Sequence, residues 1–197
     1  MKLKLASASL LLASCLPAST IQLVAAGPFN DGHDYVLPYT LSVDGHLYDA
    51  ACYDFFDSGA IGQIWSANLL SVYQAAAQGK FSAVLNSLSK YQTIARLYSL
   101  APDADKVNLQ HAIWAVFDPE AFPITGEMAG LYARADALNV SGFDYSRYIF
   151  IENSSGVQTF VIDSGPAVAE PPTYVLFISL GLCGLILGAG LKAIRGT

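Results

Sequence analysis

Alternating apolar and polar positions open the central region of the chain. Residues 35–43 and 46–55 alternate in this way on either side of Asp44-Gly45. Asp-Gly between alternating runs is typical of a two-residue turn, because both turn positions need a positive φ. The pattern therefore predicts a β-hairpin here.

Apolar residues at helical spacing follow this hairpin. Residues 81–98 place an apolar side chain every three or four positions and predict an amphipathic helix. A second helix is predicted over residues 106–117, with Asp103 or Asp105 as its N-cap. A weaker pattern predicts a third helix over residues 127–138.

Two alternating runs near the end of this region predict a second hairpin. They cover residues 146–152 and 157–163, and Asn-Ser-Ser-Gly joins them. The segment at residues 61–72 fits neither period clearly. Strands at both ends with helices between them indicate an α+β fold. We expect an antiparallel β-sandwich or barrel with two to three helices packed on one side.

The N-terminal segment has the three-part layout of a signal peptide. Two lysines precede an apolar run over residues 5–16, and small residues follow up to Ala26. We expect cleavage after Ala26, which makes residues 1–26 the signal peptide. The sequence Leu-Ala-Ser-Cys ending at Cys15 also resembles a bacterial lipobox, whose cysteine carries lipid. The alternative is that Cys15 is one of the small apolar residues of the signal.

The C-terminal segment predicts a membrane anchor. Residues 174–191 are uncharged and apolar, close to the minimum length for a transmembrane helix. Lys192 and Arg195 follow at once, so residues 192–197 are expected to form a basic cytoplasmic tail. The domain at residues 27–163 would then lie outside the membrane.

A short motif precedes this span, in the linker of residues 164–173. Glu170-Pro171, an apolar Gly-rich span and a basic end resemble the PEP-CTERM sorting signal of exopolysaccharide-producing Gram-negative bacteria. Ala169 stands where that signal usually has its first proline. The resemblance implies processing by an exosortase-like enzyme, which moves the protein from the periplasmic face of the inner membrane to the cell surface or the extracellular matrix. A plain single-span anchor is the alternative.

Charge and composition narrow the possible partners. The chain carries sixteen acidic and ten basic residues, and four of the basic ones lie in the two terminal segments. The acidic middle argues against nucleic acid as a partner. Four residues could suggest a cation site: Asp44, His46, Asp54 and Asp57. Their spacing matches no EF-hand and Asp44 already has a role in the turn, so we expect solvated or capping carboxylates, without a metal or a cofactor.

Export makes the cysteine count informative. Cys15 lies in the predicted signal peptide and Cys183 in the predicted span, so the exported domain keeps only Cys52. A lone thiol in an oxidising compartment is a liability unless it is buried, paired between chains or used in another bond.

One amide stands out on the predicted second helix. Gln110 falls on the same stripe as Val107, Trp114 and Phe117, so its carboxamide points the same way as two large aromatic rings. Burying that amide without partners would cost a few kcal/mol. We therefore expect Gln110 to be hydrogen-bonded or to take part in a reaction.

Two motifs resemble those of the thioester domains of Gram-positive surface adhesins. Residues 110–114 (Gln-His-Ala-Ile-Trp) are similar to the Thr-Gln-X-Ala motif, and residues 52–55 (Cys-Tyr-Asp-Phe) to the cysteine motif. Leu109 replaces the threonine, Ala51 replaces the aromatic residue or leucine before the cysteine, and the Gram-positive sorting signal is missing. In that family the thiol and the carboxamide condense with loss of ammonia, and the thioester captures amines on a host or matrix surface.

The resemblance implies roles for particular side chains. Cys52 and Gln110 would form the thioester, and a hydrophobic rim would keep water out. His111 would carry the proton. The candidate rim residues are Tyr53, Phe55, Trp114 and Phe117.

Two other interpretations compete with the thioester. Cys52 could be a buried, inert hydrophobe and Gln110 a bridge between backbone groups, in a surface or matrix protein that binds amines or polysaccharide without a covalent bond. Cys52 and His111 could instead form the nucleophile and base of a cysteine hydrolase, although no protease motif surrounds Cys52. We expect a protein that is not an enzyme.

Overall fold

A computed structural model describes residues 18–28, 34–140, 142–153 and 156–165. The chain divides into two units, residues 1–163 and 164–197, and all the elements below belong to the first. Several predicted features lie outside the described residues: Cys15, most of the linker, Glu170, Pro171, the predicted span with Cys183, Lys192 and Arg195. Among the residues that are described, no helix is long and apolar enough to cross a membrane.

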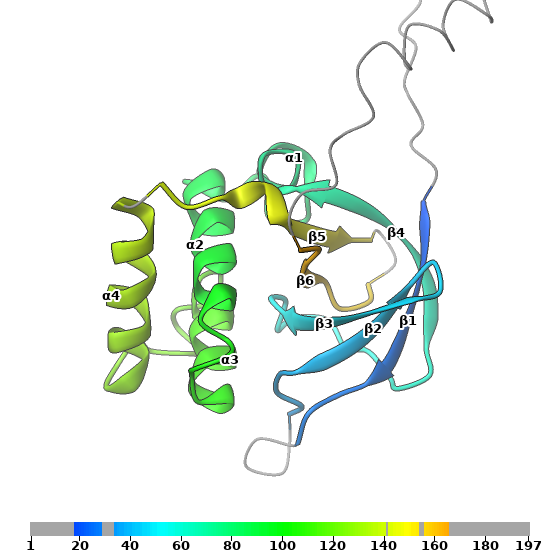
Figure 1. Ribbon diagram of the computed structural model, residues 1–197, viewed down its shortest axis with the longest axis horizontal. Coiled ribbons are helices and arrows are strands. Elements are labelled where there is room, and N and C mark those ends of the chain that lie inside the picture. The colour runs from blue at the N-terminus through cyan, green and yellow to red at the C-terminus, as the bar shows by residue number, and fades with distance from the viewer. Residues whose placement is uncertain (1–17, 29–33, 141, 154–155, 166–197) are drawn as a thin grey trace, which may run out of the picture. The chain divides into compact units, whose positions relative to one another are not determined.

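Six strands within the described residues form a closed antiparallel barrel (Figure 1). The strands are β1 (Ser19–Ala25), β2 (Tyr39–Val43), β3 (His46–Cys52), β4 (Ile64–Ser71), β5 (Tyr148–Glu152) and β6 (Phe160–Asp163). Their order around the barrel is β1-β2-β3-β6-β5-β4. The fold is therefore α+β, and the barrel is the correct one of the two predicted architectures.

Both predicted hairpins are present. Asp44 and Gly45 have φ values of 49° and 88°, as the predicted turn between β2 and β3 requires. The Asp44 carboxylate also accepts a hydrogen bond of 2.8 Å from the backbone N–H of Thr20, which joins the turn to β1. In the second hairpin, β5 pairs with β6. Both pairs of strands are shorter than predicted.

Strand β1 was not predicted, because it lies within the apolar segment that resembles a signal peptide. It pairs with β2 on one side and with β4 on the other, and so closes the barrel. Its inward side chains, Ile21 and Leu23, are fully buried. A cut after Ala26 would remove the whole strand. A cut after Ala26 is therefore not compatible with this barrel.

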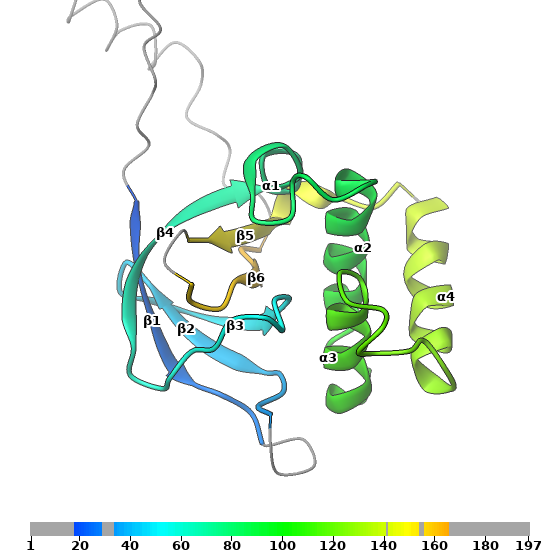
Figure 2. The same ribbon diagram turned by 180° about the vertical axis from the view of Figure 1, so that it is seen from behind.

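Four α-helices in the described part of the chain lie on one side of the barrel, one more than the most we expected (Figures 1 and 2). They are α1 (Val72–Gln78), α2 (Ser87–Ser99), α3 (Lys106–Ala115) and α4 (Glu127–Val140). Helices α2 and α3 pack beside the barrel, and α4 packs on their outer side.

Three of these helices match the predicted ones, with shifted boundaries. The predicted start of α2 at residue 81 is wrong, because Asn86 adopts a left-handed conformation with φ 58° and the helix begins after it. Asp105 is the N-cap of α3, and its carboxylate accepts the N–H of Asn108 at 2.9 Å. The unassigned segment at residues 61–72 forms β4 and the first residue of α1.

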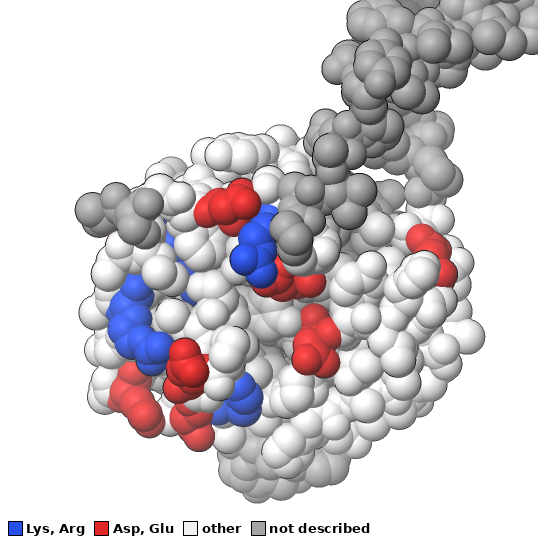
Figure 3. Space-filling model, viewed as in Figure 1, with Lys and Arg blue, Asp and Glu red and all other residues white. Residues whose placement is uncertain are grey.

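Burial along β3 changes halfway. The hairpin end is exposed or half-buried, whereas Ala50, Ala51 and Cys52 are all buried. Strands β5 and β6 are likewise buried on nearly every residue. These strands have the barrel interior on one face and helices on the other, so alternation disappears. On the face in Figure 3, charged side chains are sparse over the barrel and gather over the helices.

Candidate functional site

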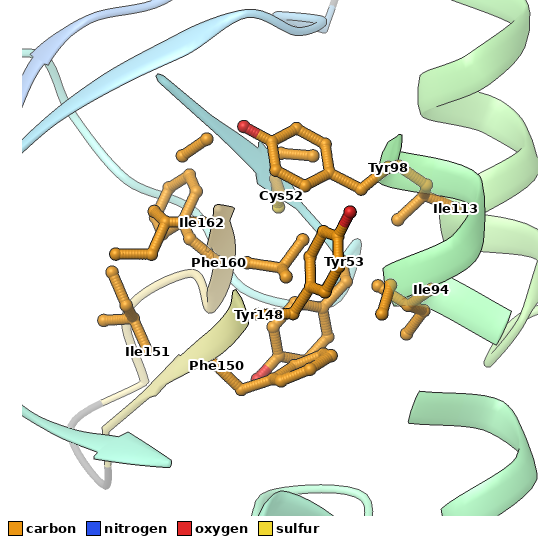
Figure 4. Close-up of a cluster of buried hydrophobic side chains, with 14 of the residues drawn as sticks. Cys52, Tyr53, Ile94, Tyr98, Ile113, Tyr148, Phe150, Ile151, Phe160 and Ile162 are labelled. Carbon is orange, nitrogen blue, oxygen red and sulfur yellow. The ribbon is translucent and has the colours of Figure 1, made fainter. Parts of the chain in front are cut away.

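Cys52 ends strand β3 at the junction of the barrel and the helices. Its side chain is fully buried, and its neighbour on β6 is Phe160. Figure 4 shows it among side chains of the barrel strands and of α2 and α3. The thiol donates a hydrogen bond of 3.1 Å to the backbone carbonyl of Asp54, two residues ahead.

Gln110 meets Cys52 directly. Its side chain is fully buried, and its Nε2 donates a hydrogen bond of 2.5 Å to the backbone oxygen of Cys52. The two residues are 58 positions apart in the sequence. The register of α3 against the end of β3 therefore brings together the two residues that the sequence motifs select.

The orientation of the Gln110 amide leaves one of its atoms without a partner. No group in the described part of the chain donates a hydrogen bond to its buried Oε1. Reversing the amide would place Oε1 against the Cys52 carbonyl, and two oxygens would then face each other at 2.5 Å. The Nε2 atom is thus held towards Cys52, and the carbonyl oxygen is left free.

Trp114 lies one helical turn after Gln110 and is almost completely buried. Phe55 packs on it with ring centroids 5.0 Å apart, and Phe122 at 5.2 Å. His111 stacks on the same indole at 5.8 Å. Phe55 is more than one-third exposed, so it forms the outer part of this aromatic cover.

The surroundings keep the Cys52 thiol protonated. Burial raises its pKa from 9.0 to about 12. The hydrogen bond to the Asp54 carbonyl and the nearby N–H of Trp114 both act in the opposite direction. A free thiol here is therefore a poor nucleophile towards reagents from solution.

Asp54 fixes the loop that follows Cys52. Its fully buried carboxylate accepts the backbone N–H of Phe56 at 2.9 Å and contacts the ammonium of Lys80. Lys80 also bonds to Asp57 at 2.7 Å. Burial alone would lower the pKa of Lys80, but the hydrogen bonds to the two aspartates outweigh it and raise the pKa. These contacts anchor the loop that carries Phe55.

Tyr53 points to a different group of polar atoms. Its hydroxyl donates to Glu152 Oε1 at 2.7 Å, and the hydroxyl of Tyr91 donates to the same oxygen at 2.8 Å. Glu152 Oε2 accepts the backbone N–H of Lys80 at 2.9 Å. We call these four residues the Glu152 cluster. A Cβ at Gly79 would overlap the carboxylate, so the cluster requires glycine there.

The predicted rim is therefore divided between two places. Phe55 and Trp114 lie with Cys52 and Gln110, whereas Tyr53 and Phe117 lie with the Glu152 cluster. Phe117 stacks on Phe81 at 4.0 Å and contacts Tyr53 at 6.4 Å. The ring of His111 lies against Trp114 and Phe122, at 5.2 Å from the latter. Its suggested role as a proton shuttle stays a prediction.

Sequence reasoning missed four residues of this region. They are Lys80, Phe122, Tyr91 and Glu152. Glu152 ends a predicted strand, where a carboxylate is ordinary. Only its burial against two tyrosines distinguishes it, and that depends on tertiary contacts. The described residues contain no cluster of three or more His, Cys, Asp or Glu side chains that could hold a metal ion.

Comparisons of the chain with protein-family models, with curated proteins and with solved structures give no match.

Proposed function

We propose that this chain is an exported surface protein that attaches covalently to amines through an internal thioester between Cys52 and Gln110. One observation supports this above the others. The carboxamide of Gln110 is buried in direct contact with Cys52, its leaving nitrogen is bound by the Cys52 carbonyl, and its oxygen has no partner among the described residues.

The chemistry needs only these two side chains. The Cys52 sulfur adds to the Gln110 carboxamide carbon, the C–N bond breaks, and the nitrogen leaves as ammonia with the thiol proton. An amine later adds to the thioester carbon, the C–S bond breaks, and the amine proton returns to sulfur. The amine is then joined to Gln110 as a stable amide. Each chain reacts once, so the protein is not an enzyme.

Exclusion of water supports the same proposal. A thioester in contact with bulk water would hydrolyse before it met an amine. Cys52 and Gln110 are both fully buried, and the rings of Trp114, Phe55 and Phe122 pack against one another on the segments that follow these two residues. The aromatic cover therefore provides the dry surroundings that the bond needs.

Export completes the proposal. The signal-like N-terminus, the PEP-CTERM-like motif with Glu170 and Pro171, and the apolar segment before Lys192 and Arg195 direct the domain out of the cytoplasm. An exosortase-like enzyme would then pass it from the inner membrane to the cell surface or extracellular matrix. We propose that the signal ends before Ser19, because β1 belongs to the barrel.

Intact mass of the chain, purified from a Gram-negative host that exports it, tests the proposal. We expect an N-terminus at or before Ser19, and a mass one ammonia below that of the sequence which remains after the cut. Methylamine should add to Gln110 as an N-methyl amide, which makes the chain heavier than its unreacted sequence by one methylene group. The variants Cys52→Ser and Gln110→Met should keep the full masses of their own sequences, without loss of ammonia. The control Gln92→Met, on α2, should still lose ammonia.

A wild-type chain that keeps its ammonia, and whose Cys52 thiol can be alkylated after unfolding, would rule out the thioester. That result would favour a second function, a non-covalent structural surface protein. The specific observation on its side is the hydrogen bond from Cys52 to the Asp54 carbonyl, which suits a buried and inert thiol.

A further inference from the structure

A buried donor and a buried acceptor lie one helical turn apart on α3, and neither has a partner in the described part of the chain. The acceptor is Gln110 Oε1 and the donor is Trp114 Nε1. Unsatisfied polar atoms are uncommon in protein interiors, because burying a donor or an acceptor without a partner is energetically unfavourable. Residues at positions i and i+4 lie on the same face of a helix. The unpaired acceptor and the unpaired donor can therefore act in the same reaction.

The proposed reaction creates a need for such a donor. When sulfur adds to the Gln110 carboxamide carbon, the carbonyl oxygen becomes an oxyanion. In a dry site this charge has to be stabilised by a fixed hydrogen-bond donor. The Gln110 Nε2 group cannot serve, because it is the leaving group and is bound to the Cys52 carbonyl.

Trp114 is well placed to supply that donor. Its indole N–H lies close enough to the sulfur of Cys52 to lower the thiol pKa, against the larger effect of burial. The N–H therefore lies near the atom that attacks, and one turn from the carboxamide that is attacked. The rings of Phe55, Phe122 and His111 pack around the indole and restrict its motion.

We propose that the Trp114 indole N–H donates a hydrogen bond to the Gln110 carbonyl oxygen when Cys52 adds to it, and again when an amine adds to the thioester. This inference rests on the proposed thioester. It gives Trp114 a role in the reaction beyond its place in the hydrophobic rim. The bonds that form and break, and the route of the proton, are unchanged.

Trp65 provides a matched control. The chain contains two tryptophans, and the indole N–H of Trp65 is also buried without a partner. Trp65 belongs to β4, and its ring contacts Phe160 at 6.2 Å. No described contact places it beside Gln110, so an unpartnered indole can be removed there without touching the proposed reaction.

The first experiment compares Trp114→Phe with Trp65→Phe in the full chain. Both variants keep an aromatic ring and lose one N–H. We expect Trp65→Phe to lose ammonia and react with methylamine as the wild type does. Trp114→Phe should do both about 100-fold more slowly, the size of effect seen when one oxyanion donor is removed. Equal rates in the two variants would overturn the inference and leave the thioester intact.

A second experiment does not depend on how Trp114→Phe folds. The two indole N–H signals of the full chain are recorded by NMR and assigned with Trp65→Phe. The N–H that stabilises the oxyanion should also donate a hydrogen bond to the oxygen of the resting thioester. We therefore expect the Trp114 signal to lie downfield in the wild type relative to Cys52→Ala. The Trp65 signal should not move. An unshifted Trp114 signal in a chain that has lost ammonia would contradict the inference alone. A wild type that retains its ammonia would overturn both proposals.

Discussion

Two buried polar groups lie on either side of the Cys52–Tyr53 peptide, and they differ in one respect. In the Glu152 cluster, each carboxylate oxygen accepts at least one hydrogen bond, and both tyrosine hydroxyls donate. Around Gln110, one hydrogen bond is made, and a carbonyl oxygen and an indole N–H have no partner among the described residues. Cys52, the last residue of β3, thus contacts the incompletely bonded group, and the next residue, Tyr53, belongs to the fully bonded cluster.

The difference indicates that buried polar groups have two different roles in this chain. A fully bonded cluster holds one conformation, because any change leaves a donor or an acceptor unpaired. An incompletely bonded group lowers stability unless its free atoms are used elsewhere. The Glu152 cluster therefore positions the end of β3, while the atoms around Gln110 remain available for a reaction. Three predictions test this contrast. The two stability measurements use a Cys52→Ala background, so that no thioester contributes to the free energy of unfolding.

The largest effect is expected at Glu152. Glu152→Leu leaves Tyr53, Tyr91 and the Lys80 backbone N–H without their acceptor. We expect the free energy of unfolding to fall by about 3–5 kcal/mol, measured by urea denaturation. The control Glu120→Leu, at an exposed position, should change it by less than about 0.5 kcal/mol. If Glu152→Leu lowers the free energy of unfolding by less than about 1 kcal/mol, the Glu152 cluster does not differ from the group around Gln110 in its contribution to stability.

A second effect concerns the thiol itself, in a Gln110→Met variant that keeps Cys52. Because burial raises the pKa of Cys52 to about 12, we expect alkylation of the native chain at pH 8 to be about 1,000-fold slower than in urea. The rate should rise about tenfold per pH unit between pH 7 and 10, without a plateau.

The same shift links folding to pH. The unfolded thiol ionises near its usual pKa of 9.0, whereas the folded one stays protonated up to about pH 12. Its contribution to stability is therefore complete below pH 9 and declines as the pH rises from 9 towards 12. In the alkylation experiment on the native Gln110→Met chain, a plateau in the rate near pH 9 would mean that the thiol is not desolvated, and it would contradict both expectations.

The smallest effect is expected for Gln110 in the Cys52→Ala background. Gln110→Met removes one hydrogen bond and an unpaired oxygen together, so the two changes offset each other. We expect the free energy of unfolding to change by less than about 1 kcal/mol, in the same urea assay. A loss as large as that of Glu152→Leu would assign Gln110 a structural role and weaken the case for a reaction.

Local patterns predicted much of the fold. The Asp44-Gly45 hairpin, the later hairpin and three helices follow from turn chemistry and periodicity within single segments. Barrel closure does not, because it depends on β1 pairing with β4 and on β3 pairing with β6, at long range. The apolar character of β1 also continues that of the preceding segment, so no local signal separates a strand from the end of an export signal.

The site divides in the same way. Cys52 and Gln110 could be selected from motifs and from the position of an amide on an apolar stripe. The unpaired atoms of Gln110 and Trp114 could not, because a missing partner is a property of the whole packed interior. The same holds for Glu152, whose two tyrosine partners lie 99 and 61 residues away.

The 58-residue separation of Cys52 and Gln110 has a mechanical consequence. A covalent bond between them would close a loop from β3 to α3 and restrict the unfolded chain by about 4 kcal/mol of entropy. In the proposed reaction, capture of an amine would open that loop at the moment of attachment. Tension from the new tether would then enter through α3 alone, so the attached protein would unfold under force more easily than the protein that still holds its thioester.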